Sequence, residues 1–346
     1  MSKLLPKAKA TAAFCILAAF ASHAAAAEDV IRLKVAGFMP VGHFLVQNGS
    51  KTWRDEVTKL TDGRVQFDYF PAQQLGKATQ MLELVQTGVA DIGEVAPAYS
   101  TSKLPLYGAL EVPGLVKSSC SGTRALSKLS KPGGVIYEND LKPSNVRAMA
   151  SFVYPAYHLF TADKKVSQIS DFAGMKIRTS GGAMEHSVSA LAGVPVKMSA
   201  PDIYQSLSRG TIDGVLFTYF STRAYDLHSI SKYATVGEGF GSASVIIMMD
   251  DKKWNSLPAD VQDAMTKAGV VAESNFCGFA DDREVENKQS FKDNGMTIVE
   301  LSDDAKAEVA NALNNVAPDW AAEMKKRGKP GAQAISDLEA ALNAED

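Results

Sequence analysis

The chain has 346 residues, of which 46% are hydrophobic, and its 36 Lys and Arg against 39 Asp and Glu give a formal net charge of −3. This mildly acidic balance, with both signs interspersed, argues against a nucleic-acid partner, and no lysine-rich amphipathic helix offers itself to a membrane surface. The length predicts two domains.

The first residues have the pattern of a secretory signal peptide. Three lysines precede a mostly apolar run from Ala10 to Ala21, which gives way to the small residues SHAAAA. Ala25 and Ala27 form an A-x-A pattern that places cleavage before Glu28, and the apolar run is too short for a membrane anchor. Removal of residues 1–27 would leave 319 residues with a formal charge of −6. We expect an exported protein.

Strand-like and helix-like segments alternate after the signal peptide. The first series is IRLKVAGF from Ile31, a helix over Leu45–Leu60, VQFDYF, a helix over Ala78–Gln86, and ADIGEV. The second series is VRAMASFVY, MKIRTS, a helix over Ala183–Leu191, VPVKMS, a helix over Pro201–Ser208, and GVLFTYF, which we interpret as a strand. Such alternation predicts an α/β fold built from two units in tandem.

The remaining segments suggest that the two units are hinged. The glycine-punctuated, β-rich stretch YATVGEGFGSASVIIMM could cross from one unit to the other. Pro258 to Asn294 carries apolar residues at spacings of three and four, which predicts one helix long enough to brace both units. From Asp303 onward we expect two or three amphipathic helices that pack against the second unit.

Two cysteines lie outside the signal peptide. Cys120 and Cys277 are far apart in the sequence, and an exported protein meets an oxidising compartment. The sequence permits either a disulfide or two buried thiols, because spacing does not reveal proximity.

Enzyme signatures are missing from the sequence. GEGFGS at Gly237 to Ser242 lacks the last glycine of a dinucleotide loop and precedes a β-like run instead of a helix. There is no P-loop, no GxSxG motif, and no CxxC or HExxH pair to hold a metal. We therefore predict no catalysis, no cofactor and no metal site; the competing hypothesis is a secreted α/β hydrolase or lyase.

Arg178 is the most informative single residue. It stands near the carboxyl end of the strand MKIRTS, where open α/β sheets place their ligands, and its guanidinium offers a fork of donors that matches a carboxylate. Gly181 and Gly182 follow at once and let a ligand approach the backbone. The alternative role for Arg178 is a structural salt bridge to a nearby Asp or Glu.

The segments around Arg178 also carry a family resemblance. DFAGMKIRTSGG and LAGVPVKMSAPDIYQSLSRGTIDG, preceded by FPAQQLG, MLELVQTGVADIG and VPGL, occur in the order and at the spacing of the substrate-binding proteins of tripartite ATP-independent periplasmic (TRAP) transporters. The sequence resembles this DctP-type family over essentially the whole mature chain.

The resemblance implies a two-lobed periplasmic binding protein of the Venus-flytrap type, with hinge strands and a long helix spanning both lobes. Lobe I would comprise 28–150 and 238–272, and lobe II 151–237 and 273–346 with the C-terminal helices. In the family a strand arginine, here Arg178, grips the carboxylate of a small organic acid. The acid then passes to a small and a large integral membrane subunit, which import it using a sodium gradient.

Several positions depart from the sialic acid and C4-dicarboxylate binders of this family. Where many members have a second arginine, this chain has His158 beside Tyr157. Phe217 stands where they carry a polar group, and the pocket-facing positions after ADIG would be Ala96, Pro97 and Tyr99. Each departure removes charge or adds an apolar surface.

These departures predict a hydrophobic or aromatic monocarboxylate as ligand, because a second carboxylate would be buried without a partner. A 2-oxo or hydroxyl group could bond to Tyr157 or His158. Further candidate contacts, which could instead be core, are Tyr154, Tyr219, Phe38 and Phe240. The alternatives are a C4-dicarboxylate or sugar acid as ligand, or a sensor for a membrane kinase. We expect a monomer, with a homodimer through the C-terminal helices left open.

Overall fold

The computed structural model of the chain describes residues 30–236 and 239–344. The expected signal peptide at 1–27 and the expected lobe boundary at residues 237 and 238 lie outside the described residues. The exact lobe boundaries therefore stay a prediction.

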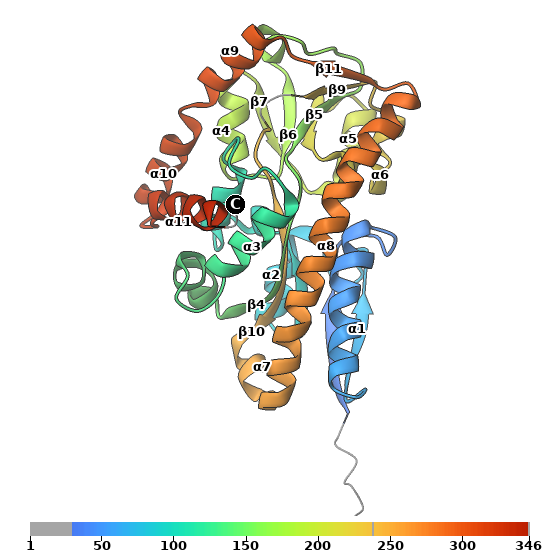
Figure 1. Cartoon of the computed structure of the whole chain (residues 1–346), viewed down its shortest axis with the longest axis vertical. Helices are drawn as coiled ribbons and strands as arrows, with labels where there is room; N and C mark the ends of the chain where they lie inside the picture. The colour runs from blue at the N-terminus through green and yellow to red at the C-terminus, as the bar shows by residue number, and fades with distance from the viewer. Residues whose placement is uncertain (1–29, 237–238, 345–346) are drawn as a thin grey trace, which may run out of the picture.

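The strands form two separate mixed sheets, one in each lobe (Figure 1). The lobe I sheet has the order β2-β1-β3-β10-β4, and its strands are β1 (Ile31–Ala36), β2 (Val65–Phe70), β3 (Ile92–Val95), β4 (Val146–Val153) and β10 (Ser244–Asp250). The lobe II sheet has the order β11-β9-β5-β8-β6-β7, and its strands are β5 (His158–Thr161), β6 (Lys176–Thr179), β7 (Val194–Lys197), β8 (Gly214–Phe217), β9 (Tyr233–Val236) and β11 (Thr297–Glu300). The predicted two-lobed α/β fold is confirmed.

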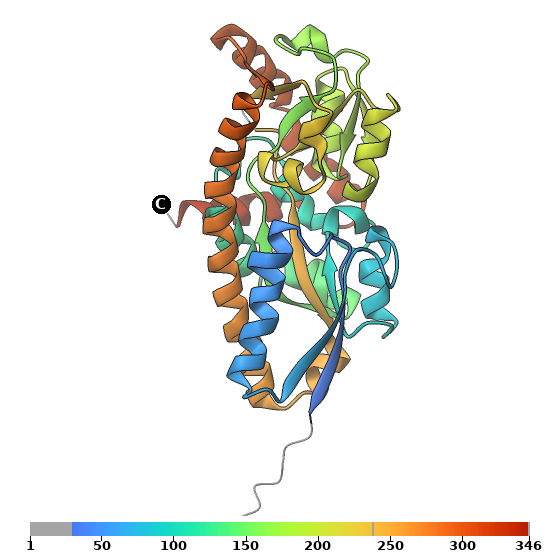
Figure 2. The ribbon, with the colours of Figure 1, turned by 90° about the vertical axis from the view of Figure 1, so that its right-hand side faces the viewer.

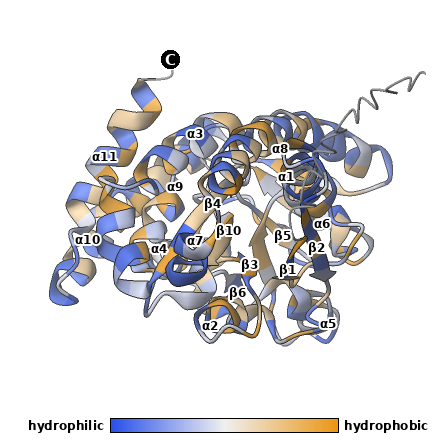
Figure 3. Ribbon diagram, turned by 90° about the horizontal axis from the view of Figure 1, so that it is seen from below, coloured by the Kyte–Doolittle hydropathy of each residue, from blue (hydrophilic) through white to orange (hydrophobic). Residues whose placement is uncertain are grey.

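Helices cover the two sheets, and Figure 3 shows their hydrophilic residues turned largely away from the apolar strands. The α-helices are α1 (Lys51–Leu60), α2 (Met81–Gln86), α3 (Ser119–Leu129), α4 (Ala183–Ala190), α5 (Ile203–Ser208), α6 (Tyr219–Ala224), α7 (Asp251–Ser256), α8 (Ala259–Asp293), α9 (Asp303–Leu313), α10 (Val316–Lys326) and α11 (Gly331–Asn343). None of the helices in the described part of the chain combines the length and the apolar character that a membrane span requires.

Before the C-terminal helices, the chain passes between the lobes three times. It enters lobe II between β4 and β5, returns to lobe I between β9 and β10, and passes to lobe II again through α8 (Figure 2). β10 pairs antiparallel with both β3 and β4, so the returning strand lies in the middle of the lobe I sheet. The glycine-rich stretch before β10 is therefore a hinge connection, as the sequence predicted.

Helix α8 is the predicted brace. Its apolar stripe, which includes Val261, Met265 and Ala268, is buried, and it packs against α1, α3 and β4 of lobe I and against α6 of lobe II. Figure 1 shows it running beside both lobes. A single helix of 35 residues thus contacts both halves of the molecule.

The interpretation of GVLFTYF as a strand is wrong for its second half. β8 ends at Phe217, and α6 begins at Tyr219. The Thr218 hydroxyl accepts a hydrogen bond from the Ser221 amide at 2.9 Å and so caps the helix. Aromatic residues at these positions suit a strand by propensity, but the cap and the packing of α6 on α8 decide for a helix.

The C-terminal helices do not all pack on lobe II. α9 and α10 contact α4, as expected, whereas α11 packs on α3 and on the 3-10 helix Pro105–Glu111 of lobe I. Figure 1 shows these three helices along one side of the molecule. The turn at Gly328, which has a φ of 71°, redirects the chain between α10 and α11.

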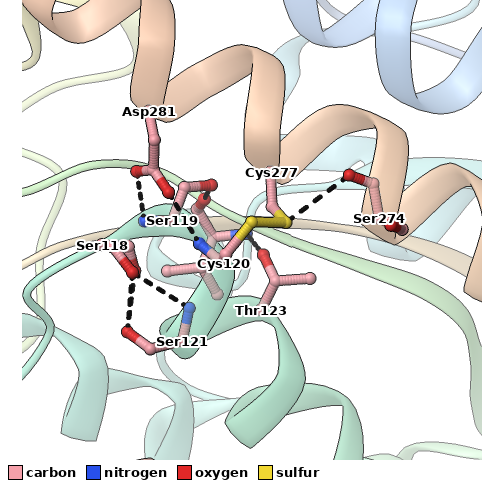
Figure 4. The surroundings of a disulfide bond; sticks show 9 residues. Ser118, Ser119, Cys120, Ser121, Thr123, Ser274, Cys277 and Asp281 are labelled. Carbon is pink, nitrogen blue, oxygen red and sulfur yellow. Dashed lines mark hydrogen bonds between the residues drawn. A yellow bond between two sulfur atoms is a disulfide. The ribbon is translucent and has the colours of Figure 1, made fainter. Parts of the chain in front are cut away.

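Cys120 and Cys277 form a disulfide that joins α3 to α8 (Figure 4). One turn further along α8, the Asp281 carboxylate accepts hydrogen bonds from the Ser119 amide at 2.6 Å and the Cys120 amide at 3.1 Å. The disulfide and this cap fasten the start of α3 to the brace helix. Of the two alternatives that the sequence allowed, the structure selects the disulfide.

Candidate ligand-binding site

Arg178 lies at the end of β6 and is 1% exposed. Its Nε donates to the Met198 carbonyl at 2.9 Å, and its Nη1 donates to the Leu216 carbonyl at 3.3 Å. The guanidinium carbon lies 5.5 Å from the centroid of the Phe217 ring. The carbonyls after β7 and in β8 therefore hold the arginine side chain in one orientation.

The charge of Arg178 has no anionic partner within the protein. Among residues 30–236 and 239–344, no carboxylate oxygen lies within 4.0 Å of its nitrogen atoms. Neutral oxygens satisfy part of the guanidinium, but they do not neutralise it, and burial of an uncompensated charge is costly. The geometry thus differs from the structural salt bridge that the sequence left open.

The Tyr99 hydroxyl connects Arg178 to the opposite lobe. Tyr99 lies in the 3-10 helix Pro97–Ser100 of lobe I, and its oxygen accepts hydrogen bonds from the Ala200 amide at 2.9 Å and from Arg178 Nη2 at 3.4 Å. A hydroxyl oxygen has two lone pairs, so both are used. The Tyr99 proton is consequently available to donate to another acceptor.

A pocket lies beside this arginine, between the lobes and the hinge. It contains about 370 Å³ of space between atoms, part of it open to solvent. Its lining residues carry no ionised side chain and include four tyrosines; they are Phe38, Ala96, Ala98, Tyr99, Tyr154, Tyr157, Ser180, Ala200, Phe217, Ser221, Tyr225, Ala243, Ser244 and Val245. The lining is therefore apolar and rich in hydroxyls, and the Arg178 cation adjoins it through its hydrogen bond to Tyr99.

Three phenols of the pocket, those of Tyr154, Tyr157 and Tyr225, stay neutral. Burial raises the pKa of Tyr154, Tyr157 and Tyr225 well above the ordinary value of 10.0, and for Tyr157 the Arg178 charge opposes this rise. The effect of Arg178 on Tyr157 indicates that this hydroxyl lies near the guanidinium. These tyrosines can donate and accept hydrogen bonds, but they supply no charge.

The structure brings together part of the predicted site. Arg178 adjoins the pocket, and the predicted residues that line it are Phe38, Tyr99, Tyr154, Tyr157 and Phe217. The predicted residues that do not line it are Pro97, His158, Gly181, Tyr219 and Phe240.

His158 and Tyr219 pack on each other outside the pocket. Their ring centroids are 5.1 Å apart, and His158 Nε2 lies 3.7 Å from a carboxylate oxygen of Glu284 on α8. Burial lowers the pKa of His158 to about 4, so the imidazole is neutral near pH 7. Tyr219 turns toward Phe160 because it begins a helix instead of continuing the strand. His158 therefore lies outside this pocket, in contact with Tyr219 and close to Glu284.

The other three residues are placed elsewhere for local reasons. Pro97 begins a 3-10 helix whose turn leaves Ala96, Ala98 and Tyr99 at the pocket. Phe240 packs against Phe172, with ring centroids 6.0 Å apart. Gly181 has a φ of 126°, and a side chain there would meet the Ala98 carbonyl across the lobe boundary at 2.8 Å.

Sequence reasoning missed several pocket residues, most of them small: Ala98, Ser180, Ala200, Ser221, Tyr225, Ala243, Ser244 and Val245. Tyr225 is the largest of these. It follows Ser221 by four residues and is the C-cap of α6, so a helical interpretation of this segment would have placed both on one face. The small residues carry no signal that the sequence alone could reveal.

Glu111 is a second buried ionisable group at the lobe boundary. It ends the 3-10 helix Pro105–Glu111, and its Oε2 accepts a hydrogen bond from the Met184 amide of α4 at 3.4 Å. Burial raises its pKa to about 8. Lys197 lowers this pKa and Glu185 raises it, while Arg178 has a smaller lowering effect. Glu111 thus links lobe I to the start of α4 in lobe II.

Residues 39–323 match the family model of bacterial extracellular solute-binding protein, family 7, also named DctP. The chain belongs to this family. A solute-binding protein of Roseobacter denitrificans is 26% identical over 310 residues, which are 86% of this chain and 90% of the relative. The C4-dicarboxylate-binding periplasmic protein DctP of Rhodobacter capsulatus is 25% identical over 299 residues, which are 85% of this chain and 86% of the relative.

A solved structure shares the fold closely. A TRAP solute-binding protein from an unidentified marine microbe, specific for aromatic acid ligands and crystallised with 3-hydroxybenzoate, has a TM-score of 0.85 and 25% identity and covers 92% of this chain and 99% of its own. The family 7 chain described here is accordingly a TRAP solute-binding receptor and not an enzyme. Receptors of this type bind small molecules and work with membrane subunits.

Proposed function

We propose that this receptor captures a hydrophobic or aromatic monocarboxylate in the periplasm and delivers it to the membrane subunits of a TRAP transporter. The single observation that supports this is the buried Arg178, which has neutral partners and no carboxylate in the described part of the chain. A ligand carboxylate would accept from the free donors of the guanidinium and from the Tyr99 hydroxyl, which already uses both lone pairs.

The walls of the pocket favour an apolar ligand body. Phe38, Phe217 and four tyrosines surround the space, and its lining residues include no cation. A second carboxylate on the ligand would lose its hydration without gaining a counter-charge, which costs several kcal/mol. The marine relative that is specific for aromatic acids is similar to this chain over nearly its whole length, which agrees with this ligand class.

A C4-dicarboxylate is the second candidate ligand, because the Rhodobacter capsulatus relative binds one by name. The two candidates make opposite predictions in a thermal-shift panel of benzoate, phenylacetate, a branched-chain 2-oxo acid, succinate and malate. We expect a large rise in melting temperature with one or more of the monocarboxylates and little with the dicarboxylates. A large rise with succinate or malate alone would contradict the proposal.

The ligand can also be identified without a panel. Native mass spectrometry of the protein purified from its own periplasm would reveal the mass of any bound acid. We expect a stoichiometric monocarboxylate that is released unchanged on denaturation. A dicarboxylate at that stoichiometry would favour the second candidate.

Two features of the delivery step belong to the same proposal. We expect cleavage of the precursor before Glu28, which N-terminal sequencing of the periplasmic protein would check. We expect uptake to require a sodium gradient, because the family resemblance implies it. Uptake by proteoliposomes that contain both membrane subunits, with and without that gradient, tests the requirement; equal uptake in both would contradict it.

A further inference from the structure

The four tyrosine hydroxyls of the pocket fall into two pairs. Tyr99 accepts a hydrogen bond from Arg178, and the Arg178 charge lowers the pKa of Tyr157, so both belong to the carboxylate end of the pocket. In the described chain Tyr154 and Tyr225 make no hydrogen bond to Arg178, although the Arg178 charge also lowers the pKa of Tyr225. The Tyr154 hydroxyl lies 3.8 Å from the Met39 sulfur, which is a weak acceptor, and within the described chain the Tyr225 hydroxyl has no hydrogen-bond partner.

The rings of this second pair are held firmly. Tyr154 packs against Phe220, with ring centroids 5.9 Å apart, and Tyr225 packs against His43 and Phe217 at 5.5 Å and 5.9 Å. Their hydroxyls therefore cannot swing to distant partners without disturbing the core. A polar group in a pocket wall that lacks a partner is a site where a ligand group gains a hydrogen bond at little cost in ordering.

The surroundings of this pair suit a neutral group. Both phenols are kept protonated by burial, and each hydroxyl can donate one hydrogen bond and accept others. The Glu94 carboxylate raises the pKa of both phenols, whereas the Arg178 charge lowers that of Tyr225. A ligand hydroxyl could both donate to and accept from these phenols, whereas a ligand carboxylate could only accept.

We propose that the Tyr154 and Tyr225 hydroxyls form a second subsite, which binds a hydroxyl group on the body of the ligand. The receptor would then select hydroxylated aromatic acids over their unsubstituted counterparts. This inference rests on the proposed function, since it needs a carboxylate held at Arg178 to bring the ligand body against the second pair.

The test is isothermal titration calorimetry with matched ligand pairs, benzoate against 3- and 4-hydroxybenzoate and phenylacetate against mandelate. The proteins are the parent chain, Tyr154→Phe, Tyr225→Phe and the double variant, each of which loses only hydroxyls. We expect the parent chain to bind the hydroxylated member of at least one pair about 3- to 10-fold more tightly. The double variant should lose that preference, so that the hydroxylated and unsubstituted members of each pair bind to it with affinities within about 2-fold of each other.

Tyr219→Phe is the matched control, because the Tyr219 hydroxyl is also buried without a partner but lies outside the pocket. This variant should keep the preference, and melting temperatures without ligand report whether each variant is folded. The inference is overturned if the parent chain prefers none of the hydroxylated acids, or if the double variant keeps the preference. It is also overturned if Tyr219→Phe abolishes the preference. Binding of the unsubstituted acids in these cases leaves the proposed function intact, whereas no binding of any acid contradicts both.

Discussion

Two buried arginines in this molecule have opposite electrostatic situations. Arg54 on α1 lies 3.5 Å from the Glu94 carboxylate, and its guanidinium stacks on the Tyr69 ring at 3.9 Å from the centroid. Arg178 is at least as buried and also lies near aromatic rings, but its partners in the described chain are neutral oxygens.

Under the proposed function, the same side chain serves structure in one place and binding in another. Glu94 is held in turn by Ser50, so the Arg54 site is electrostatically complete within lobe I. We propose that an external carboxylate completes the Arg178 site. Removing one partner of a buried ion pair destabilises the folded protein more than replacing both partners does. The fall in the free energy of unfolding when each arginine is replaced should therefore reveal which arginine has its anionic partner within the protein.

The largest effect is expected from Arg54→Met. This change leaves Glu94, whose pKa burial already raises, without its cationic partner. We expect the free energy of unfolding to fall by about 3–5 kcal/mol, because an unpaired buried carboxylate remains. Chemical denaturation of the ligand-free protein measures it. A loss below about 1 kcal/mol would show that the pair is not a structural element.

Arg178→Met is the matched change at the incomplete site. We expect affinity for the receptor's best carboxylate to fall about 100-fold or more, because the bidentate charge pair is lost. The free energy of unfolding without ligand should change far less than in Arg54→Met, since no protein carboxylate is orphaned. Arg178→Lys keeps the charge but not the planar fork, and we expect intermediate affinity. Unchanged affinity in Arg178→Met would refute the role of this residue.

Gly182→Ala tests whether the lobes must approach closely to complete the Arg178 site. A Cβ at Gly182, which has a φ of 61°, would lie 2.2 Å from Glu111 Oε2 in the other lobe. We expect affinity to fall about 10-fold through hindered closing, in addition to a left-handed backbone cost of about 1 kcal/mol.

Gly174→Ala is the control for this change. Gly174 has a φ of 71° and no neighbour within 4 Å of an added Cβ, so it bears the backbone cost without the contact between lobes. Titration of ligand into both variants separates the two effects. Equal affinities in the two variants would indicate that the Glu111 contact does not limit closing.

The smallest effect is expected from pH. Burial raises the pKa of Glu111 from its ordinary 4.5 to about 8, and we expect the ordinary value to return when the lobes open. The closed form then binds the proton more tightly than the open form does. This proton therefore favours closing fully below about pH 4.5, and its contribution is lost as the pH rises toward 8. Affinity should fall about 5-fold between pH 7 and 8, since one proton changes it by no more than about 10-fold per pH unit.

Glu111→Gln mimics the protonated side chain and should flatten this profile. Calorimetry in buffers of different ionisation enthalpy would measure the proton taken up on binding. Lys197, Glu185 and Arg178 also face Glu111, so a profile that survives in Glu111→Gln would assign the dependence to other groups. Affinity that rises with pH would contradict the sign of the linkage.

Much of the fold could be predicted from local patterns. The alternation of strands and helices, the long helix α8 and the hinge stretch before β10 follow from periodicity and turn residues that act over a few neighbours. Arg178 could be singled out because its strand position and the glycines after it are local features. The family motifs around it are also continuous stretches of sequence.

The rest depends on contacts between residues far apart in the chain. Thr218 and the packing on α8 turn the segment after Phe217 into a helix, which removes Tyr219 from the pocket and brings in Tyr225. His158 faces Glu284 because α8 passes behind β5. Spacing alone also does not show that Cys120 on α3 meets Cys277 on α8. The sequence by itself determined the fold class and the binding cation, since both are encoded within short segments. Only the tertiary structure decided which side chains surround that cation, because packing between distant elements sets their directions.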